Sequence, residues 1–131
     1  MAGLGGYPMA GVLRAEDFER AKKFYTQVLG LGEGMSMGPG GSMFTAGDGS
    51  MVMIYERPGM PAPQNTTLGF AVPGNKFDSV VAELRDAGVV FEDYDIPDQG
   101  IKTVNGVADI NGSKAVWFKD SEGNILNVAT M

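Results

Sequence analysis

The sequence predicts one α+β domain built from two similar halves, each with the order strand–helix–strand–strand–strand. The chain of 131 residues is one domain's worth of polypeptide. Its 20 glycines are about twice the usual share, and many stand in pairs or clusters that mark tight turns between short strands. The apolar positions of the first helix also recur 59 residues later in the second helix. The equivalent pairs are Phe18 and Phe77, Ala21 and Val80, and Tyr25 and Leu84.

The first half, residues 7–56, begins with a predicted strand over 8–14. Asp17 suits the N-cap of a helix that runs to Val28, because the apolar residues in this stretch form one stripe at helical spacing. The helix ends at Leu29-Gly30, with glycine where a left-handed C-cap is needed. Further strands are predicted at 32–38, 42–46 and 50–56, with a turn at 47–49 before the last of them.

The second half, residues 67–131, follows a linker at 57–66 whose three prolines and one glycine oppose regular structure. Its helix is predicted over 76–87 and ends at Gly88. An insertion at 97–113 contains two Asn-Gly steps, which predict extra turns or a hairpin. Strands are predicted at 67–72, 89–96, 115–119 and 124–130, with turns at 73–75 and 120–123.

The composition excludes several classes of protein. With no cysteine and no histidine, the chain has no disulfides, no thiolate chemistry, and neither the commonest metal ligand nor the commonest general base. A net charge of −6 opposes binding to nucleic acid or to an anionic membrane. No apolar run approaches the ~20 residues of a membrane-spanning helix, and the N-terminus lacks the features of a secretory signal. We therefore expect a cytoplasmic protein.

Two motifs give the chain a resemblance to a known family. The first, D-x-x-x-A-x-x-F-Y-x-x-x-L-G, runs from Asp17 to Gly30, and the second, D-x-x-G-N, runs from Asp120 to Asn124. With both motifs the chain resembles the vicinal-oxygen-chelate superfamily, which includes glyoxalase I, the bleomycin-resistance and fosfomycin-resistance proteins and the extradiol dioxygenases. The resemblance implies two βαβββ modules that form a U-shaped, partly open mixed β-barrel. It places the helices outside and the ligand on the concave face.

The resemblance also implies the positions of the metal ligands, which fall here on Ala10, Met53, Thr67 and Asn127. The metal chemistry of the superfamily needs about three or four His, Glu or Gln side chains that converge on one ion. Ala10 has no donor, Met53 has a soft thioether, and the other two have neutral oxygens. We therefore expect no metal and no cofactor, and none of the Lewis-acid chemistry of glyoxalases, fosfomycin-modifying enzymes or metal dioxygenases.

Strand alternation tests this placement, because the neighbours of concave-facing residues must face the helices. Glu56 follows Ile54 by two residues and so belongs to the same face of the strand. It is therefore expected to point away from the concave face or to lie at the strand end. The predicted helix-facing residues are mostly aliphatic or aromatic: Gly11, Leu13, Val52, Ile54, Leu68, Phe70, Val72, Leu126 and Val128.

We expect one concave surface to bind a small molecule. Alternation turns either Trp117 or Phe118 toward it, where the ring would stack on a planar ligand. The expected ligand-binding residues are Arg14, Met53, Tyr55, Thr67, Trp117 and Asn127.

The resemblance implies a metal-independent small-molecule-binding protein of the glyoxalase/bleomycin-resistance type. Such a protein sequesters an antibiotic or another planar or amphipathic compound, and the acidic chain favours a cationic or amphipathic one. The alternative is an uncharacterised vicinal-oxygen-chelate enzyme, lyase or dioxygenase-like, that acts without a conventional metal site. The sequence identifies no catalytic residue, so we lean away from an enzyme.

A homodimer is also expected, because one curled module leaves unpaired strand edges, and exposed edges are usually paired or covered. The Pro-rich linker allows the two modules to pair within one chain or to swap between chains.

Overall fold

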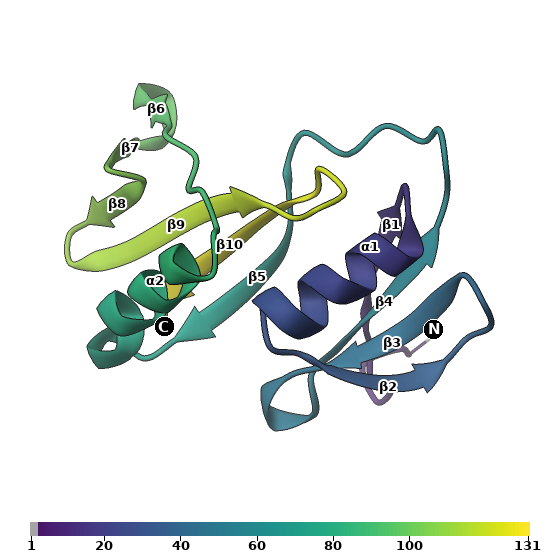
Figure 1. Cartoon of the computed structure of the whole chain (residues 1–131). Helices are drawn as coiled ribbons and strands as arrows, with labels where there is room; N and C mark the ends of the chain where they lie inside the picture. The colour runs from purple at the N-terminus through teal and green to yellow at the C-terminus, as the bar shows by residue number, and fades with distance from the viewer. Residues whose placement is uncertain (1–2) are drawn as a thin grey trace.

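The computed structural model describes residues 3–131 and shows two modules, each a sheet with one helix packed on it (Figure 1). The first module contains β1 (Gly11–Ala15), α1 (Phe18–Lys23), β2 (Gly32–Ser36), β3 (Gly41–Thr45) and β4 (Met51–Glu56), with a 3-10 turn at Gly47–Gly49. The strand order is β1-β4-β3-β2, and β1 runs parallel to β4 while the other pairs are antiparallel. This confirms the predicted order strand–helix–strand–strand–strand.

The second module repeats this plan and extends it. It contains β5 (Thr66–Val72), α2 (Phe77–Asp86), β6 (Asp95–Ile96), β7 (Ile101–Val104), β8 (Val107–Ile110), β9 (Ser113–Lys119) and β10 (Ile125–Thr130), with 3-10 turns at Gly74–Lys76 and Pro97–Gln99. The strand order is β5-β10-β9-β8-β7-β6, and β5 runs parallel to β10. Within residues 3–131 the two sheets share no ladder of hydrogen bonds, so they do not close into a barrel.

The first helix begins and ends where its sequence predicts. Asp17 is the N-cap, and its carboxylate accepts the Arg20 N–H at 3.2 Å. The helix continues through a π-helical segment, Phe24–Val28, after which the Leu29 N–H donates to the Phe24 carbonyl. Gly30 follows at a φ of +76°, the left-handed conformation for which glycine is suited. In the part of the chain that the structure describes, no helix is long and apolar enough to cross a membrane.

The predicted strand over 89–96 is wrong for most of its length. Phe91 makes an isolated bridge to Phe118, and only the two residues of β6 form a strand. The reason is that the Tyr94 N–H donates to the Thr103 side-chain oxygen, at 2.8 Å, rather than to a backbone carbonyl of a neighbouring strand. The predicted hairpin in the insertion is confirmed, because β7 and β8 meet at a turn where Asn105 and Gly106 both have positive φ.

The two Asn-Gly turns of the insertion allow a matched test of this hairpin. A Cβ on Gly106, at φ +82°, would lie 2.6 Å from the Phe91 Cβ, whereas one on Gly112, at φ +90°, would meet nothing within 4 Å. We expect Gly112→Ala to lower the free energy of unfolding by about 1 kcal/mol and Gly106→Ala by about 2–4 kcal/mol. Urea unfolding measures both, and equal losses would show that Phe91 does not pack against this turn.

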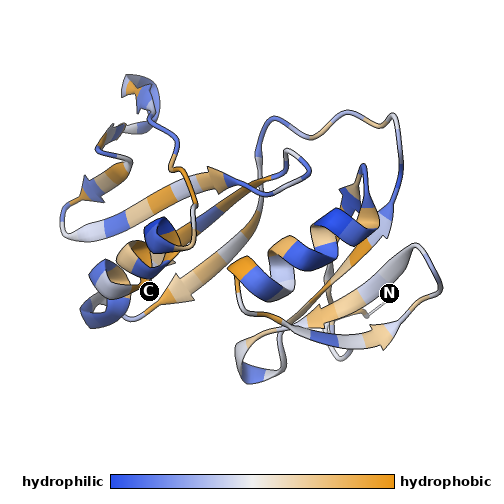
Figure 2. Ribbon diagram, viewed as in Figure 1, coloured by the Kyte–Doolittle hydropathy of each residue, from blue (hydrophilic) through white to orange (hydrophobic). Residues whose placement is uncertain are grey.

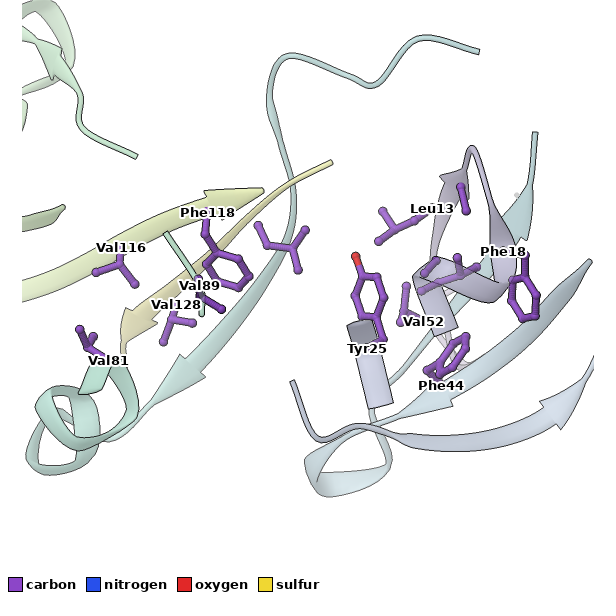
Figure 3. Close-up of a cluster of buried hydrophobic side chains, with 14 of the residues drawn as sticks. Leu13, Phe18, Tyr25, Phe44, Val52, Val81, Val89, Val116, Phe118 and Val128 are labelled. Atoms are coloured by element: carbon purple, nitrogen blue, oxygen red, sulfur yellow. The ribbon is translucent and has the colours of Figure 1, made fainter. Parts of the chain in front are cut away.

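The core lies between the helices and the sheets, as the alternation of the strands predicts. The labelled residues in Figure 3 come from both modules and form one cluster of buried side chains. Hydrophilic and hydrophobic residues alternate around both helices in Figure 2, so each helix keeps a polar outer face. The predicted helix-facing residues Leu13, Val52, Ile54, Leu126 and Val128 are all at most 5% exposed. The residues between them on each strand therefore face away from the helices.

The turn between β9 and β10 joins the two modules through a buried polar network. The Asp120 carboxylate accepts the Tyr25 hydroxyl at 2.5 Å, and the Tyr25 ring itself is fully buried in the first module. Asp120 also accepts the Glu122 and Asn124 N–H groups at 2.8 and 2.9 Å, and the Asn124 side-chain amide at 2.9 Å. Burial, and then the Asp120 carboxylate, raise the pKa of Tyr25, so its hydroxyl stays protonated and donates.

Glu122 ties the same turn to the start of α1. Its carboxylate accepts the Asp17 N–H at 2.8 Å and forms an ion pair with Arg20 at 2.8 Å. Burial alone would raise the pKa of Glu122, but hydrogen bonds from Arg20, Ser121 and the Asp17 N–H outweigh it and lower the pKa to about 2.

This lowered pKa predicts a loss of stability in acid. A carboxyl group whose pKa falls on folding stabilises the folded state above its ordinary pKa of 4.5, and the contribution disappears as the pH falls toward 2. We expect Glu122 to account for a loss of about 1–2 kcal/mol across this range, a modest figure because Arg20 is 53% exposed. Urea unfolding of the wild type and of Glu122→Gln at several pH values measures it, and an unchanged acid profile in the variant would contradict it.

Candidate functional site

The second module carries a hollow of about 410 Å³ on its sheet. Trp117 lies between Val116 and Phe118, both fully buried in the core, so strand alternation turns Trp117 to the opposite face of β9. The walls of the hollow come from the end of the linker, from the stretch 94–101 and from strands β9 and β10. The lining residues are Gln64, Asn65, Thr66, Tyr94, Ile96, Gln99, Ile101, Trp117 and Ile125.

Two aromatic rings form one side of this hollow. Tyr94 and Trp117 pack edge to face, with 5.5 Å between ring centroids and 76° between ring planes. Burial, and then the nearby Glu92 carboxylate, raise the pKa of the Tyr94 hydroxyl, so it remains a hydrogen-bond donor at neutral pH. Trp117 is partly exposed, which leaves part of its ring surface accessible to a ligand.

The hairpin of the insertion holds Tyr94 in this position. The Asp93 carboxylate accepts the Thr103 hydroxyl and the Gly106 N–H, each at 2.8 Å. Both hydrogen bonds lower the pKa of Asp93, and the bond from Thr103 has the larger effect. The backbone of Tyr94 is also fixed, because its carbonyl accepts the Thr103 N–H at 2.9 Å. These hydrogen bonds hold residues 93–94 against the hairpin that β7 begins. In this position the Tyr94 ring packs against Trp117.

The chemistry of the hollow is neutral and amphipathic. Its polar groups are the amides of Gln64, Asn65 and Gln99 and the hydroxyls of Thr66 and Tyr94, and none of its lining side chains carries a formal charge. The three isoleucines supply apolar surface beside the two rings. Such a lining suits an uncharged, flat molecule that has hydrogen-bonding groups at its edge, whereas a charged ligand would lose its hydration without gaining a partner.

Four of the predicted site residues, Met53, Tyr55, Trp117 and Asn127, fall on the faces of the two sheets that are turned away from the helices. Met53 and Tyr55 alternate with buried Val52 and Ile54 on β4 and are partly exposed. Asn127 occupies the same row as Trp117, its partner on β9. Only Trp117 among the predicted residues lines the hollow, and Met53, Tyr55 and Asn127 lie outside it.

Thr67 is displaced by an irregularity in β5. Thr66 pairs with Ile125 and Leu68 pairs with Leu126, so Thr67 is an extra residue in a β-bulge. Its hydroxyl donates to the Ile125 carbonyl at 3.1 Å. As a result, its neighbour Thr66 reaches the hollow.

Arg14 takes part in the junction between the modules. Its Nη1 donates to the Glu122 carbonyl at 2.9 Å and to the Asn124 side-chain oxygen at 3.1 Å. Its Nε is buried and has no hydrogen-bond partner among the described residues. The structure therefore directs Arg14 toward the turn at 120–124 rather than toward the hollow.

Most of the lining residues that the sequence does not reveal come from two segments with no clear periodic pattern. Gln64 and Asn65 belong to the predicted linker, and Tyr94, Gln99 and Ile101 belong to the stretch 94–101. The Asn-Gly steps identify a hairpin in the insertion, but they do not indicate which face of the sheet it covers. Tyr94 stands within a run of acidic residues, a pattern typical of a solvated strand end or loop.

The residues at the superfamily's metal positions do not fit a metal ion. Ala10 has no atom that could coordinate a metal, and the Thr67 hydroxyl is a neutral, weak ligand that is directed at the Ile125 carbonyl. The Asn127 side-chain oxygen lies over Gly69, 2.5 Å from where a Cβ would stand on that glycine. Among residues 3–131, no three His, Cys, Asp or Glu side chains are grouped so that they could hold a metal. Glu56 is turned to the helix as expected, because it accepts the Phe18 N–H at 3.1 Å.

Comparisons with known proteins agree with this architecture. Lactoylglutathione lyase from Agrobacterium tumefaciens is similar with a TM-score of 0.71 and 18% identity, over 98% of this chain and 96% of that chain. The fosfomycin resistance protein FosX from Mesorhizobium loti is similar with a TM-score of 0.66 and 14% identity, over 95% and 92%. An integron cassette protein from the metagenome of the Halifax Harbour sewage outfall gives 0.69 and 16%, over 95% and 98%. At these identities the likeness concerns the fold alone.

No curated protein matches the chain. The family model described as Glyoxalase/Bleomycin resistance protein/Dioxygenase superfamily matches residues 9–128, which is nearly the whole sequence. With its two βαβββ modules and this match, the chain belongs to the glyoxalase/bleomycin resistance protein/dioxygenase superfamily.

Proposed function

We propose that this protein binds a small, uncharged, planar or amphipathic molecule without the help of a metal ion, in the hollow around Trp117. The observation that carries the proposal is the lining of that hollow, in which amides, hydroxyls, isoleucines and two aromatic rings surround about 410 Å³. An antibiotic with a flat, uncharged ring system belongs to this chemical class. The residues at the four metal positions support the metal-independent part of the proposal, because none of them has a carboxylate or an imidazole.

A fluorescence titration tests this function, because Trp117 is the only tryptophan of the chain. The probes are coumarin and anthraquinone, which are flat and uncharged, and coumarin-3-carboxylate, which adds a negative charge to the same ring. We expect a saturable change in Trp117 emission with at least one neutral probe and weaker binding of the carboxylate by about tenfold or more. Equal binding of coumarin and its carboxylate, or no saturable change with any probe, would contradict the proposal.

The proposal includes a homodimer, and the exposed face of the first sheet supports it. Val12, Met53 and Met43 form one row across β1, β4 and β3 on the face turned away from α1. Val12 is 57% exposed, the neighbouring Met51 is 42% exposed, and Met43 and Met53 are partly exposed, so this face presents apolar surface to solvent. A second copy of the chain would cover it.

Sedimentation equilibrium tests the dimer. We expect a mass of about twice the 13.8 kDa of the chain, and a shift toward the monomer in Met53→Glu, which puts a charge into the apolar row. A single species at the mass of one chain at micromolar concentration would contradict it.

A further inference from the structure

An equivalent backbone hydrogen bond occurs in both modules, and it shows to which side the N–H and carbonyl groups of β1 and β5 point. The Arg57 N–H donates to the Ala15 carbonyl at 2.8 Å in the first module, and the Met131 N–H donates to the Val72 carbonyl at 3.0 Å in the second. In a parallel ladder a residue presents its N–H and its carbonyl to the same side, and the next residue presents both to the other side. Arg14 therefore presents its backbone groups to the open edge of β1. Ala71 and Gly69 present theirs to the open edge of β5.

These two edges are equivalent positions in the repeat. Arg14 pairs with Tyr55, and Ala71 pairs with Ala129, so both residues hold the same place in their parallel ladders. The number of residues that separates Tyr55 from Ala129 also separates the turn 46–50 from the turn 120–124. Each turn stands beside the free strand edge of the other module.

On the open edge of β1, the Arg14 carbonyl has a hydrogen-bond partner in the side-chain carboxamide of Asn124. The Asn124 side-chain amide donates to the Arg14 carbonyl at 2.9 Å and also to the Asp120 carboxylate at 2.9 Å. Asn124 is only 1% exposed, so this amide fills the junction between β1 and the turn.

Among the described residues, no hydrogen bond from the equivalent turn of the first module reaches the edge of β5. Ser50 stands where the second module has Asn124, and its hydroxyl donates to the Gly47 carbonyl, at 2.6 Å, inside its own turn. Ala46 stands where the second module has Asp120. Among the described residues, no further backbone hydrogen bond reaches Gly69 or Ala71 from this side.

A groove of about 420 Å³ occupies the place where the carboxamide is missing. It runs along five consecutive residues of β5, and most of its accessible surface is apolar. Its lining residues are Leu31, Phe44, Ala46, Gly47, Asp48, Ser50, Met51, Val52, Leu68, Gly69, Phe70, Ala71 and Val72.

We propose that this groove is a second ligand site, which takes a small uncharged molecule with a primary carboxamide and an apolar body. The ligand amide donates to the Ala71 carbonyl, as the Asn124 amide does to the Arg14 carbonyl in the other junction. Its apolar body lies against the partly exposed side chains of Leu31, Phe70 and Val72. The Asp48 carboxylate at the rim disfavours anions, so a carboxylic acid of the same shape is a poor ligand.

Nuclear magnetic resonance with cyclohexanecarboxamide tests this site. The compound cannot stack as a planar ring would on Trp117, and it has a matched analogue, cyclohexyl methyl ketone, in which a methyl group replaces the amide nitrogen. We expect saturable shifts of the Ala71 carbonyl carbon and of the Gly69 and Ala71 amides on adding the carboxamide. The ketone should bind about 3- to 10-fold more weakly, because it lacks the donor.

Three variants distinguish binding in this groove from binding elsewhere on the protein. Ala46→Trp fills the groove from its exposed rim and should abolish the shifts, whereas Ala82→Trp, on the exposed face of α2, should preserve them. Ser50→Asn restores the residue found in the other turn and should weaken binding by competing for the Ala71 carbonyl. Persistence of the shifts in Ala46→Trp, equal binding of the ketone, or shifts confined to residues around Trp117 would each overturn the proposal.

Discussion

Asp120→Ala is expected to destabilise the protein by about 3–5 kcal/mol, the largest effect of any substitution considered. The Asp120 side chain accepts four hydrogen bonds, and its removal leaves the Tyr25 hydroxyl and two backbone N–H groups buried without an acceptor. Since these donors come from both modules, the substitution weakens the turn and the junction together. Urea unfolding, followed by circular dichroism, measures the change.

Tyr25→Phe is the matched control for that prediction. It removes one of the four hydrogen bonds and leaves the remaining donors satisfied, so we expect a loss of about 1–2 kcal/mol. If Asp120→Ala prevents folding altogether, Tyr25→Phe still reports the strength of the junction. A loss below about 1 kcal/mol in Asp120→Ala would show that this turn does not hold the modules together.

Trp117→Ala is expected to weaken binding in the hollow by about 10- to 100-fold, because it removes the largest surface on which a flat ligand can stack. The effect on the free energy of unfolding should be small by comparison, because Trp117 is partly exposed while its neighbours Val116 and Phe118 form the core. Isothermal titration calorimetry with the best neutral probe measures the affinity, because the variant has no tryptophan emission to follow.

Trp117→Phe provides the comparison for this second prediction. It retains an aromatic face of smaller area, and we expect it to keep most of the affinity, within about fivefold of the wild type. Equal losses in both variants would show that the ring contributes by shaping the hollow rather than by stacking.

The fold could be predicted in detail because its signals are local and repeated. Asp17 caps its helix, Gly30 ends it, and the alternation on β4 and β10 divides core residues from exposed ones as expected. The failure over 89–96 has a different origin. The stretch opens with the strand-forming residues Val89, Val90 and Phe91, but Asp93 and Tyr94 form their hydrogen bonds with Thr103 in the hairpin of the insertion.

The candidate site could be predicted only in part, because it depends on contacts between segments. Alternation along a single strand left either Trp117 or Phe118 facing the concave surface, and the structure buries Phe118 and turns Trp117 to the hollow. The position of Arg14 could not be anticipated, because its guanidinium is drawn to the turn at 120–124, more than 100 residues away. Thr67 was shifted by a bulge, and bulges leave little signal in a sequence.

The crystal structure of the protein bound to the neutral probe of highest affinity, grown after treatment with a chelator, tests the central claim most directly. We predict that the flat ring of the probe lies against Trp117 between Tyr94 and Ile101, with its polar edge on the amides of Gln64, Asn65 or Gln99. The complex should contain no metal ion between protein and ligand. A probe bound only outside this hollow, or a complex that forms only when a divalent cation is added back, would contradict the account.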